Sequence, residues 1–376
     1  MAWVTAFAAS QCGNRMYRMK AGGRTFRTRV MLPFGGEKLR LTLASMYGTR
    51  LNIGAMSVTA HGKTLAVSVD QNRAFVVEKD QRLLTDEIPL SVEDGEEIEI
   101  RTYFAKGFFQ SGLWQETEIS VPGDYTQKDF VLSEDDLWAS RKRPLDIGVP
   151  FPAVAGVDVL NPAEDAKAVA ILGASNEFLG RWVKPLRASL ASLAPHTALL
   201  DLSISGNRLL KDTGNQILLG NLFGYRAGKR FKDEILGFSG IQDVILCIGG
   251  NDILQPHTFA CYPWEQEPSF KELTSALEEL IFLSHSEGIK VIGTTITPLK
   301  CADGFSEKKR LLRKEVNAWM KAFPGYDAVF DLSSVIQSPE DPDRMNEVYN
   351  SGDFVHFNAA GGQAIADAFP CEYLNS

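Results

Sequence analysis

The sequence predicts an all-β unit followed by an α/β unit. Before residue 146, short segments alternate apolar and polar side chains and are separated by glycine-rich turns. After residue 165, continuous apolar runs alternate with amphipathic stretches long enough for helices. We therefore predict a β-sandwich, jelly-roll-like, over residues 1–145, a proline- and charge-rich linker over 146–165, and a three-layer α/β/α domain with a parallel five-stranded sheet over 166–376.

The strands of the first unit follow from a period of two residues. Lys38–Leu43 and Glu97–Arg101 alternate apolar and polar side chains, which is typical of half-buried strands. Shorter candidate strands are Thr25–Val30, Asn52–Val58, Leu65–Val69 and Glu87–Leu90. Turns at Gly22-Gly23, Gly35-Gly36 and Asp94-Gly95 separate these segments. No stretch of this unit has a strong helical pattern.

The second unit begins with Ala168–Leu172, an unbroken apolar run of the kind expected in a parallel strand buried on both faces. Further strands are predicted at Ala198–Ile204, Asp243–Ile248, Ile289–Ile296 and Ala328–Leu332. Helices are predicted at Leu179–Leu193, Phe223–Leu236, Phe270–His285, Glu307–Phe323 and Asn358–Phe369. Since ligands bind at the carboxyl ends of the strands in such sheets, the residues directly after each strand are the candidates for a site.

Composition and charge exclude several classes of function. The chain of 376 residues has 39 basic and 47 acidic residues, a net charge of −8, so nucleic acid is a poor partner because phosphate neutralisation drives that affinity. No apolar run approaches the ~18 residues of a membrane span. The N-terminus has no basic segment typical of a secretion signal, so we expect a cytoplasmic protein with no membrane partner. The cysteines and histidines show no zinc-ligand spacing, and we expect no metal.

Residues suited to acyl transfer follow the predicted strands. Ser175 comes after the first strand and opens a helix, which makes its hydroxyl a candidate nucleophile. His356 is the candidate general base, because a neutral imidazole is well suited to proton transfer near pH 7. Asp353 stands three residues before His356 and can turn its carboxylate onto the imidazole. The sequence therefore predicts a Ser–His–Asp arrangement that needs no metal or organic cofactor.

An enzyme of this kind also needs donors for the developing oxyanion. Gly206, after the second strand, offers a backbone N–H that no side chain obstructs. Asn251, after the third strand, offers a neutral amide donor. With the N–H of Ser175 they would form an oxyanion hole in which each donor contributes ~3 kcal/mol. We interpret the neighbouring Asp252 as a cap of the turn after Asn251.

The segments that carry these residues resemble the four blocks of the SGNH (GDSL-type) hydrolase family: Gly173–Glu177, Ser203–Leu210, Gly249–Asp252 and Ser351–Gly361. The resemblance covers about residues 166–370 and implies a carboxylic ester hydrolase with Ser175 as nucleophile, Asp353 and His356 as orienting acid and base, and Gly206 and Asn251 as oxyanion donors. The first unit resembles the N-terminal β-domain of a two-domain bacterial subgroup, best over Tyr47–Gly54.

One departure from the family pattern affects the expected activity. The usual Gly-Asp-Ser is Gly173-Ala174-Ser175 here, and in the family that Asp supports the nucleophile loop through hydrogen bonds. The resemblance implies an esterase acting on short acyl (acetyl) esters of a carbohydrate or small alcohol. A lipase or thioesterase of the same family stays open, as does a carbohydrate-binding protein impaired in catalysis, which Ala174 favours.

Three further residues are predicted to contact the substrate. Asn207 follows the predicted oxyanion glycine, and His257 follows the segment of Asn251. Trp264 belongs to the aromatic stretch Cys261–Glu265, which separates the third strand from its helix and could form a wall of an acyl or sugar pocket. The expected partner is thus a small-molecule or carbohydrate ester.

Overall fold

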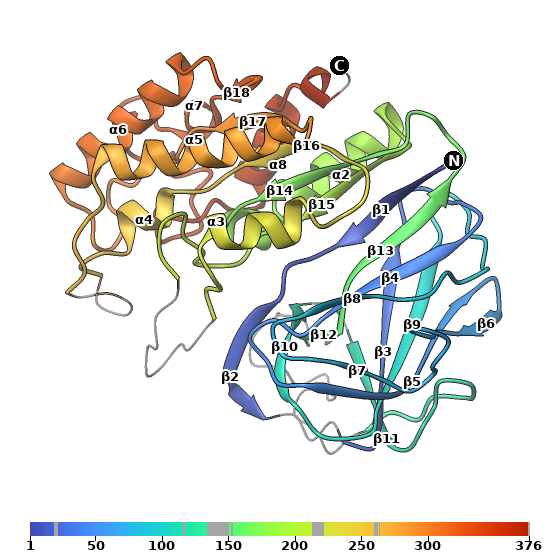
Figure 1. The fold of residues 1–376 in the computed structure, drawn as a ribbon. Helices are drawn as coiled ribbons and strands as arrows, with labels where there is room; N and C mark the ends of the chain where they lie inside the picture. Colours follow the sequence, from blue (N-terminus) through green and yellow to red (C-terminus); the bar gives the residue numbers. More distant parts are fainter. Residues whose placement is uncertain are drawn as a thin grey trace. The chain divides into compact units, whose positions relative to one another are not determined.

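The computed structural model describes residues 1–18, 22–114, 117–133, 150–151, 153–212, 222–258, 262 and 264–374. The chain forms two compact units, Met1–Lys167 with Ile217–Gly224, and Ala168–Gln216 with Tyr225–Ser376 (Figure 1).

The first unit is built from antiparallel β-sheets, as the alternating segments predict. One sheet has the strand order β1-β13-β4-β8, a second β11-β3-β9-β5-β6 with β7 beside β5, and a short third sheet β12-β10-β2. The strands are β1 (Ala2–Ala8), β2 (Cys12–Arg18), β3 (Arg24–Met31), β4 (Leu39–Ala44), β5 (Leu51–Ala60), β6 (Lys63–Ala66), β7 (Phe75–Val77), β8 (Arg82–Leu84), β9 (Glu97–Phe104), β10 (Phe109–Trp114), β11 (Thr117–Pro122), β12 (Pro150–Phe151) and β13 (Ala153–Asn161).

The period of two in β9 is visible in its burial. Ile98, Ile100, Thr102 and Phe104 are buried, while Glu99, Arg101 and Tyr103 between them are partly exposed. Phe104 meets Phe26 of β3 edge to face, with ring centroids 5.2 Å apart, so both strands send aromatic rings into the same core. The predicted strand over Glu87–Leu90 is reduced to an isolated bridge between Leu39 and Ile88.

The stretch predicted as a linker contains a central strand instead. Residues 153–161 form β13, which pairs with β1 on one side and with β4 on the other. Nearly all of its residues are buried, Val154, Val157 and Val159 completely. The prolines and charges that precede this strand predict a linker from local composition, whereas the pairing partners lie more than a hundred residues earlier in the chain. Residues 146–149 and 152 of the predicted linker lie outside the described residues.

The second unit contains the predicted parallel sheet of five strands. Its order is β15-β14-β16-β17-β18, with β14 (Lys167–Leu172), β15 (Thr197–Asp201), β16 (Ile241–Leu246), β17 (Lys290–Thr294) and β18 (Ala328–Phe330). The ladders β14–β16, β16–β17 and β17–β18 are parallel. In this order the chain direction across the sheet reverses between β14 and β16. A crevice therefore forms at the carboxyl ends of these two strands, which is where such folds bind ligands.

Helices cover both faces of the sheet (Figure 1). They are α1 (Ser175–Phe178), α2 (Val183–Leu193), α3 (Ala227–Arg230), a π-helical turn (Phe231–Ile235), α4 (Gly250–Leu254), α5 (Phe270–Ser286), α6 (Glu307–Ala322), α7 (Leu332–Ile336), α8 (Ala359–Ala368) and a 3-10 turn (Cys371–Leu374). The apolar side chains of α2, α7 and α8 share one core with β14, β16 and β17. Helix α5 packs against β17 and α6.

Two predicted helices are shorter than the sequence pattern indicates. The stretch Leu179–Leu193 contains Gly180 at φ +68°, a left-handed conformation that separates α1 from α2. The stretch Phe223–Leu236 is helical only from Ala227, as α3 and the π-helical turn. The break at Gly180 leaves Ser175 on a single helical turn directly after β14.

Candidate active site

Ser175 is the first residue of α1 and follows β14 through the turn Gly173-Ala174. Its Oγ lies 2.8 Å from Nε2 of His356, which is 181 residues away in the sequence. The turn depends on the glycine, because a Cβ at Gly173 would lie 2.6 Å from Oε2 of Glu177. The hydroxyl of Ser175 thus faces the imidazole of His356 at the carboxyl end of β14.

The other ring nitrogen of His356 contacts Asp353. The Nδ1···Oδ2 distance is 2.5 Å, and the second carboxylate oxygen accepts the backbone N–H groups of Val355 and His356 at 2.9 and 2.8 Å. Burial acts to raise the pKa of Asp353, but the hydrogen bonds from His356 and Val355 outweigh it and lower this pKa to about 2. Because an ionised carboxylate can only accept, Nδ1 carries the proton and Nε2 of the neutral ring is free to accept from the Ser175 hydroxyl.

The short loop that carries both residues is fixed by its own hydrogen bonds. Oδ1 of Asn350 accepts the N–H groups of Gly352 and Phe354, each at 2.9 Å. Gly352 and Phe354 take φ values of +112° and +57°. The completely buried Phe357 follows and anchors the loop in the core below the sheet edge. This rigidity holds the imidazole in one orientation toward Ser175.

The predicted oxyanion donors lie on two connected loops. Asn251 is in the first turn of α4, after Gly249 at φ +107°, and its amide nitrogen donates to the backbone oxygen of Asn207 at 3.0 Å. The amide has a second N–H available for another acceptor. Gly206 takes φ +75°, and its oxygen accepts from the Gln255 amide at 2.9 Å. Asn251 lines the same pocket as Ser175. Gly206 is not among the described residues that line this pocket.

Asp252 does not act as the cap predicted for the turn after Asn251. Its carboxylate accepts the backbone N–H groups of Leu209 and Leu210 at 2.7 and 2.9 Å, on the loop that follows β15. Burial raises the pKa of Asp252 to about 6, and the two N–H donors only partly oppose this rise. The residue therefore connects the loop of Asn251 with the loop of Gly206.

A small pocket opens beside the serine hydroxyl. Its volume is about 70 Å³, and Ser175, Asn176 and Asn251 are among its polar lining residues. The rest of the lining is mostly small or aliphatic and includes Gly249, Gly250, Ile296, Leu299, Leu332 and Val355. Glu177 is also among the lining residues, so the pocket contains a carboxyl group, and its small size suits a small group next to the hydroxyl.

Glu177, two residues after the serine, is a site residue that the sequence alone did not single out. It is 4% exposed, and its carboxylate accepts the Ala174 N–H at 3.0 Å and the Trp182 indole N–H at 3.2 Å. Burial raises its pKa to about 7. The carboxylate therefore supports the turn before Ser175 from below. A glutamate in the first turn of a helix usually faces solvent, so no local pattern indicates this burial.

The three additional residues predicted to contact substrate are not at the pocket. Asn207 is 1% exposed, and its side chain donates to the Tyr225 carbonyl oxygen and accepts from Arg230. His257 and Trp264 are exposed, Trp264 by 92% of its surface. None of the three is among the described residues that line the pocket.

Two further properties concern metals and membranes. Among the residues with described coordinates, no group of three or more His, Cys, Asp and Glu side chains could hold a metal ion. In the same part of the chain, every helix is too short or too polar to cross a bilayer.

Comparison with solved structures finds chains that are similar to just over half of this chain. A GDSL-like lipase from Bacteroides thetaiotaomicron is 18% identical, with a TM-score of 0.39, over 55% of this chain and 87% of that one. An acetylxylan esterase from Geobacillus stearothermophilus is 14% identical, with a TM-score of 0.40, over 54% and 92%. The esterase EstA from Pseudoalteromonas sp. is 16% identical, with a TM-score of 0.38, over 56% and 100%. A search of curated proteins finds no relative.

A family model decides the classification. The model of the GDSL-like Lipase/Acylhydrolase family matches residues 169–364, which is more than half of the chain. The match begins in β14 and ends in α8, so it includes Ser175, Asn251, Asp353 and His356. The chain belongs to the GDSL-like lipase/acylhydrolase family, a family of carboxylic ester hydrolases.

Proposed function

We propose that this protein is a serine esterase that hydrolyses short acyl esters through an acyl-enzyme. One observation carries the proposal: a continuous hydrogen-bonded chain runs from Ser175 Oγ to His356 and on to Asp353, with distances of 2.8 and 2.5 Å. A serine hydroxyl is a weak nucleophile until a base takes its proton, and this arrangement supplies both the base and the group that orients it.

The reaction proceeds in two halves. Ser175 Oγ forms a bond to the ester carbonyl carbon while its proton passes to His356 Nε2. The imidazolium is stabilised by Asp353, and it returns the proton to the leaving alcohol when the tetrahedral intermediate collapses. Water then attacks the acyl-enzyme with His356 again acting as base, which releases the carboxylic acid and restores the Ser175 hydroxyl.

We assign the developing oxyanion to the N–H groups of Ser175 and Gly206 and to the second amide N–H of Asn251. The support for Asn251 is its place in the pocket and its bond to the Asn207 oxygen, which holds the amide in a fixed orientation. Preorganised donors of this kind contribute ~3 kcal/mol each to lowering the barrier.

The size of the pocket supports a short acyl group. The volume of about 70 Å³ accommodates an acetyl group, whereas most of an octanoyl chain would have to lie outside the pocket. For the leaving group we propose a carbohydrate or small alcohol. The support is the resemblance to carbohydrate deacetylases of the family, which also carry an N-terminal β-domain. Ala174, the departure from the family motif, instead favours a catalytically impaired carbohydrate-binding protein.

Hydrolysis of p-nitrophenyl acetate tests the proposal. The wild type should turn over this ester, and Ser175→Ala and His356→Ala should each lose at least ~10³-fold in kcat/KM. A second Asp–His pair provides a matched control: His285 lies 2.9 Å from Asp327 at the other end of the sheet, and His285→Ala should retain full activity. If the wild type and both site variants hydrolyse the ester equally slowly, the esterase proposal is wrong and the binding-protein alternative gains support.

The length and type of the acyl ester that reacts fastest distinguish a short-chain esterase from a lipase or a thioesterase of the same family. Acetate should react faster than octanoate if the pocket sets the acyl preference. A preference for octanoate or longer acyl groups would favour a lipase, and a preference for thioesters over oxygen esters would favour a thioesterase. A screen of acetylated sugars then identifies the leaving alcohol.

A further inference from the structure

One wall of the pocket is formed by the segment that follows β17. Ile296 belongs to this wall and is 7% exposed. Its side chain lies over the turn before Asn251: a Cβ placed on Gly250 would be 3.4 Å from Ile296 Cγ2, and one on Gly249 would be 3.8 Å from its Cδ1. The position of Ile296 therefore limits the depth of the pocket on the side of Asn251.

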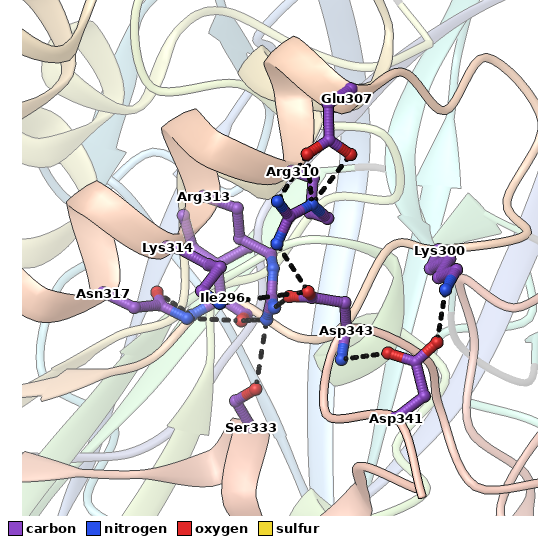
Figure 2. Close-up of polar contacts among 10 residues, drawn as sticks. All are labelled: Ile296, Lys300, Glu307, Arg310, Arg313, Lys314, Asn317, Ser333, Asp341 and Asp343. Atoms are coloured by element: carbon purple, nitrogen blue, oxygen red, sulfur yellow. Dashed lines mark hydrogen bonds and ion pairs between the residues drawn. The ribbon is translucent and has the colours of Figure 1, made fainter.

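The backbone of Ile296 is held by a side chain of α6. Asn317 accepts the Ile296 N–H at 2.8 Å with Oδ1 and donates to the Ile296 carbonyl oxygen at 2.9 Å with Nδ2 (Figure 2). Arg313 donates to the same carbonyl oxygen at 3.2 Å. One amide thus satisfies both backbone groups of Ile296, and the bidentate geometry defines the position and the orientation of this residue.

The two hydrogen bonds between Asn317 and the backbone of Ile296, here called the clamp, are supported by further contacts of α6. Arg313 also donates to Ser333 Oγ at 3.2 Å and forms an ion pair with Asp343 at 2.6 Å, and Arg310 reaches Asp343 at 2.8 Å (Figure 2). The charge of the buried Arg313 is therefore compensated. These contacts join α6 to α7 and to the loop around Asp343.

The burial of these polar residues requires an explanation. Lys309, Arg313 and Asn317 recur every four residues on the inward face of α6, and each is less than 9% exposed. A buried amide, guanidinium or ammonium is costly unless it is hydrogen-bonded, and these three side chains bind backbone groups that an apolar side chain would leave unpaired. An apolar side chain could not bind the peptide groups of Ile296, which points to positioning as the role of Asn317.

We propose that Asn317 is a specificity-determining positioning residue: by clamping Ile296 it keeps the pocket short, so that acetyl esters are accepted and longer acyl esters are excluded. This inference rests on the proposed esterase function. It assigns the acyl preference to a side chain that lies behind the pocket wall and touches no substrate.

Loosening the clamp should widen the pocket. Asn317→Asp keeps the shape of the side chain and can still accept the Ile296 N–H, but it places a carboxylate oxygen against the Ile296 carbonyl oxygen. The wall should move outward and admit further methylene groups. Burial of the two additional methylene groups of a butyryl chain should strengthen binding of the transition state about 10-fold. The ratio of kcat/KM for p-nitrophenyl butyrate to kcat/KM for p-nitrophenyl acetate should therefore rise about 10-fold.

The experiment compares this ratio in the wild type, Asn317→Asp, Ile296→Ala and the double variant. Ile296→Ala widens the pocket directly and should raise the ratio, and Asn317→Asp should add little in that background because it acts through Ile296. The control is Lys314→Ala on the same helix, an exposed residue 4.0 Å from Asp343, which should leave the ratio unchanged. If Asn317→Asp fails to fold, Asn317→Ser takes its place with the same expected rise.

The outcomes separate the two proposals. If the wild type hydrolyses esters but Asn317→Asp lowers kcat/KM for acetate and butyrate by the same factor, Asn317 is only structural and this inference is overturned. The inference is also overturned if Asn317→Asp raises the butyrate-to-acetate ratio by the same factor in the wild type and in Ile296→Ala. If the wild type hydrolyses no ester faster than Ser175→Ala does, the esterase proposal itself fails, and the inference fails with it.

Discussion

Replacing Asp353 by asparagine tests the proposed chemistry at its most sensitive contact. In the wild type one carboxylate oxygen binds His356 Nδ1, and the other accepts two backbone N–H groups. The asparagine oxygen can keep the two backbone bonds, so the loop should stay folded. The amide NH₂ then faces Nδ1, and two donors cannot share a hydrogen bond. The imidazole must carry its proton on Nε2, where it can no longer accept the proton of Ser175.

The magnitude follows from the exposure of Asp353. Its side chain is 49% exposed, so the attraction between carboxylate and imidazolium at about 4 Å acts through a medium between water and the protein surface and amounts to about 2–3 kcal/mol. The change of tautomer adds about 1–2 kcal/mol, comparable to one lost hydrogen bond. Together these correspond to about a 10³-fold loss in kcat for p-nitrophenyl acetate at pH 7.5.

The assay is steady-state kinetics combined with thermal unfolding. KM should change little, because the lost interaction is strongest in the transition state. Asp327→Asn, which alters the second Asp–His pair, is the control and should keep wild-type kcat. The reasoning is refuted if Asp353→Asn folds normally and loses less than about 10-fold in kcat, because another group would then orient His356.

Three other perturbations have defined outcomes. Asn251→Ala should lower kcat by about 10²–10³-fold with KM within about 3-fold, and an equal rise in KM would contradict a role in the transition state. Lys309→Met should lower the free energy of unfolding by about 3 kcal/mol in urea denaturation, because a buried ammonium that binds three carbonyl oxygens is lost; a change below about 1 kcal/mol would contradict this. Glu177 has its pKa raised by burial from 4.5 to about 7, so the folded state binds its proton more tightly and wild-type stability should fall by about 3 kcal/mol between pH 4.5 and 7. Glu177→Gln should remove this dependence, and parallel stability curves for the two proteins would refute the assignment.

The local patterns of the sequence determined the fold class of both units. Periods of two residues and unbroken apolar runs depend only on which faces of a strand are buried, so β9 and β14 are recognisable without their neighbours. The positions of Ser175 and Asn251 shortly after β14 and β16 are equally local, and His356 stands shortly before the predicted last helix. Because parallel strands end at one edge, the sequence also indicated that these residues lie on the same side of the sheet.

Tertiary structure decided what depends on distant partners. The stretch 153–161 has a linker-like composition before it, and only pairing with β1 and β4 makes it a central strand. Glu177 and Asn317 have the sequence context of exposed helical residues, yet both are buried. Glu177 accepts N–H groups of the nearby Ala174 and Trp182, whereas Asn317 binds the peptide groups of Ile296 in another segment. The local sequence shows how polar a side chain is. It does not show which buried N–H or C=O group needs that side chain as a hydrogen-bond partner, because the folded chain determines this.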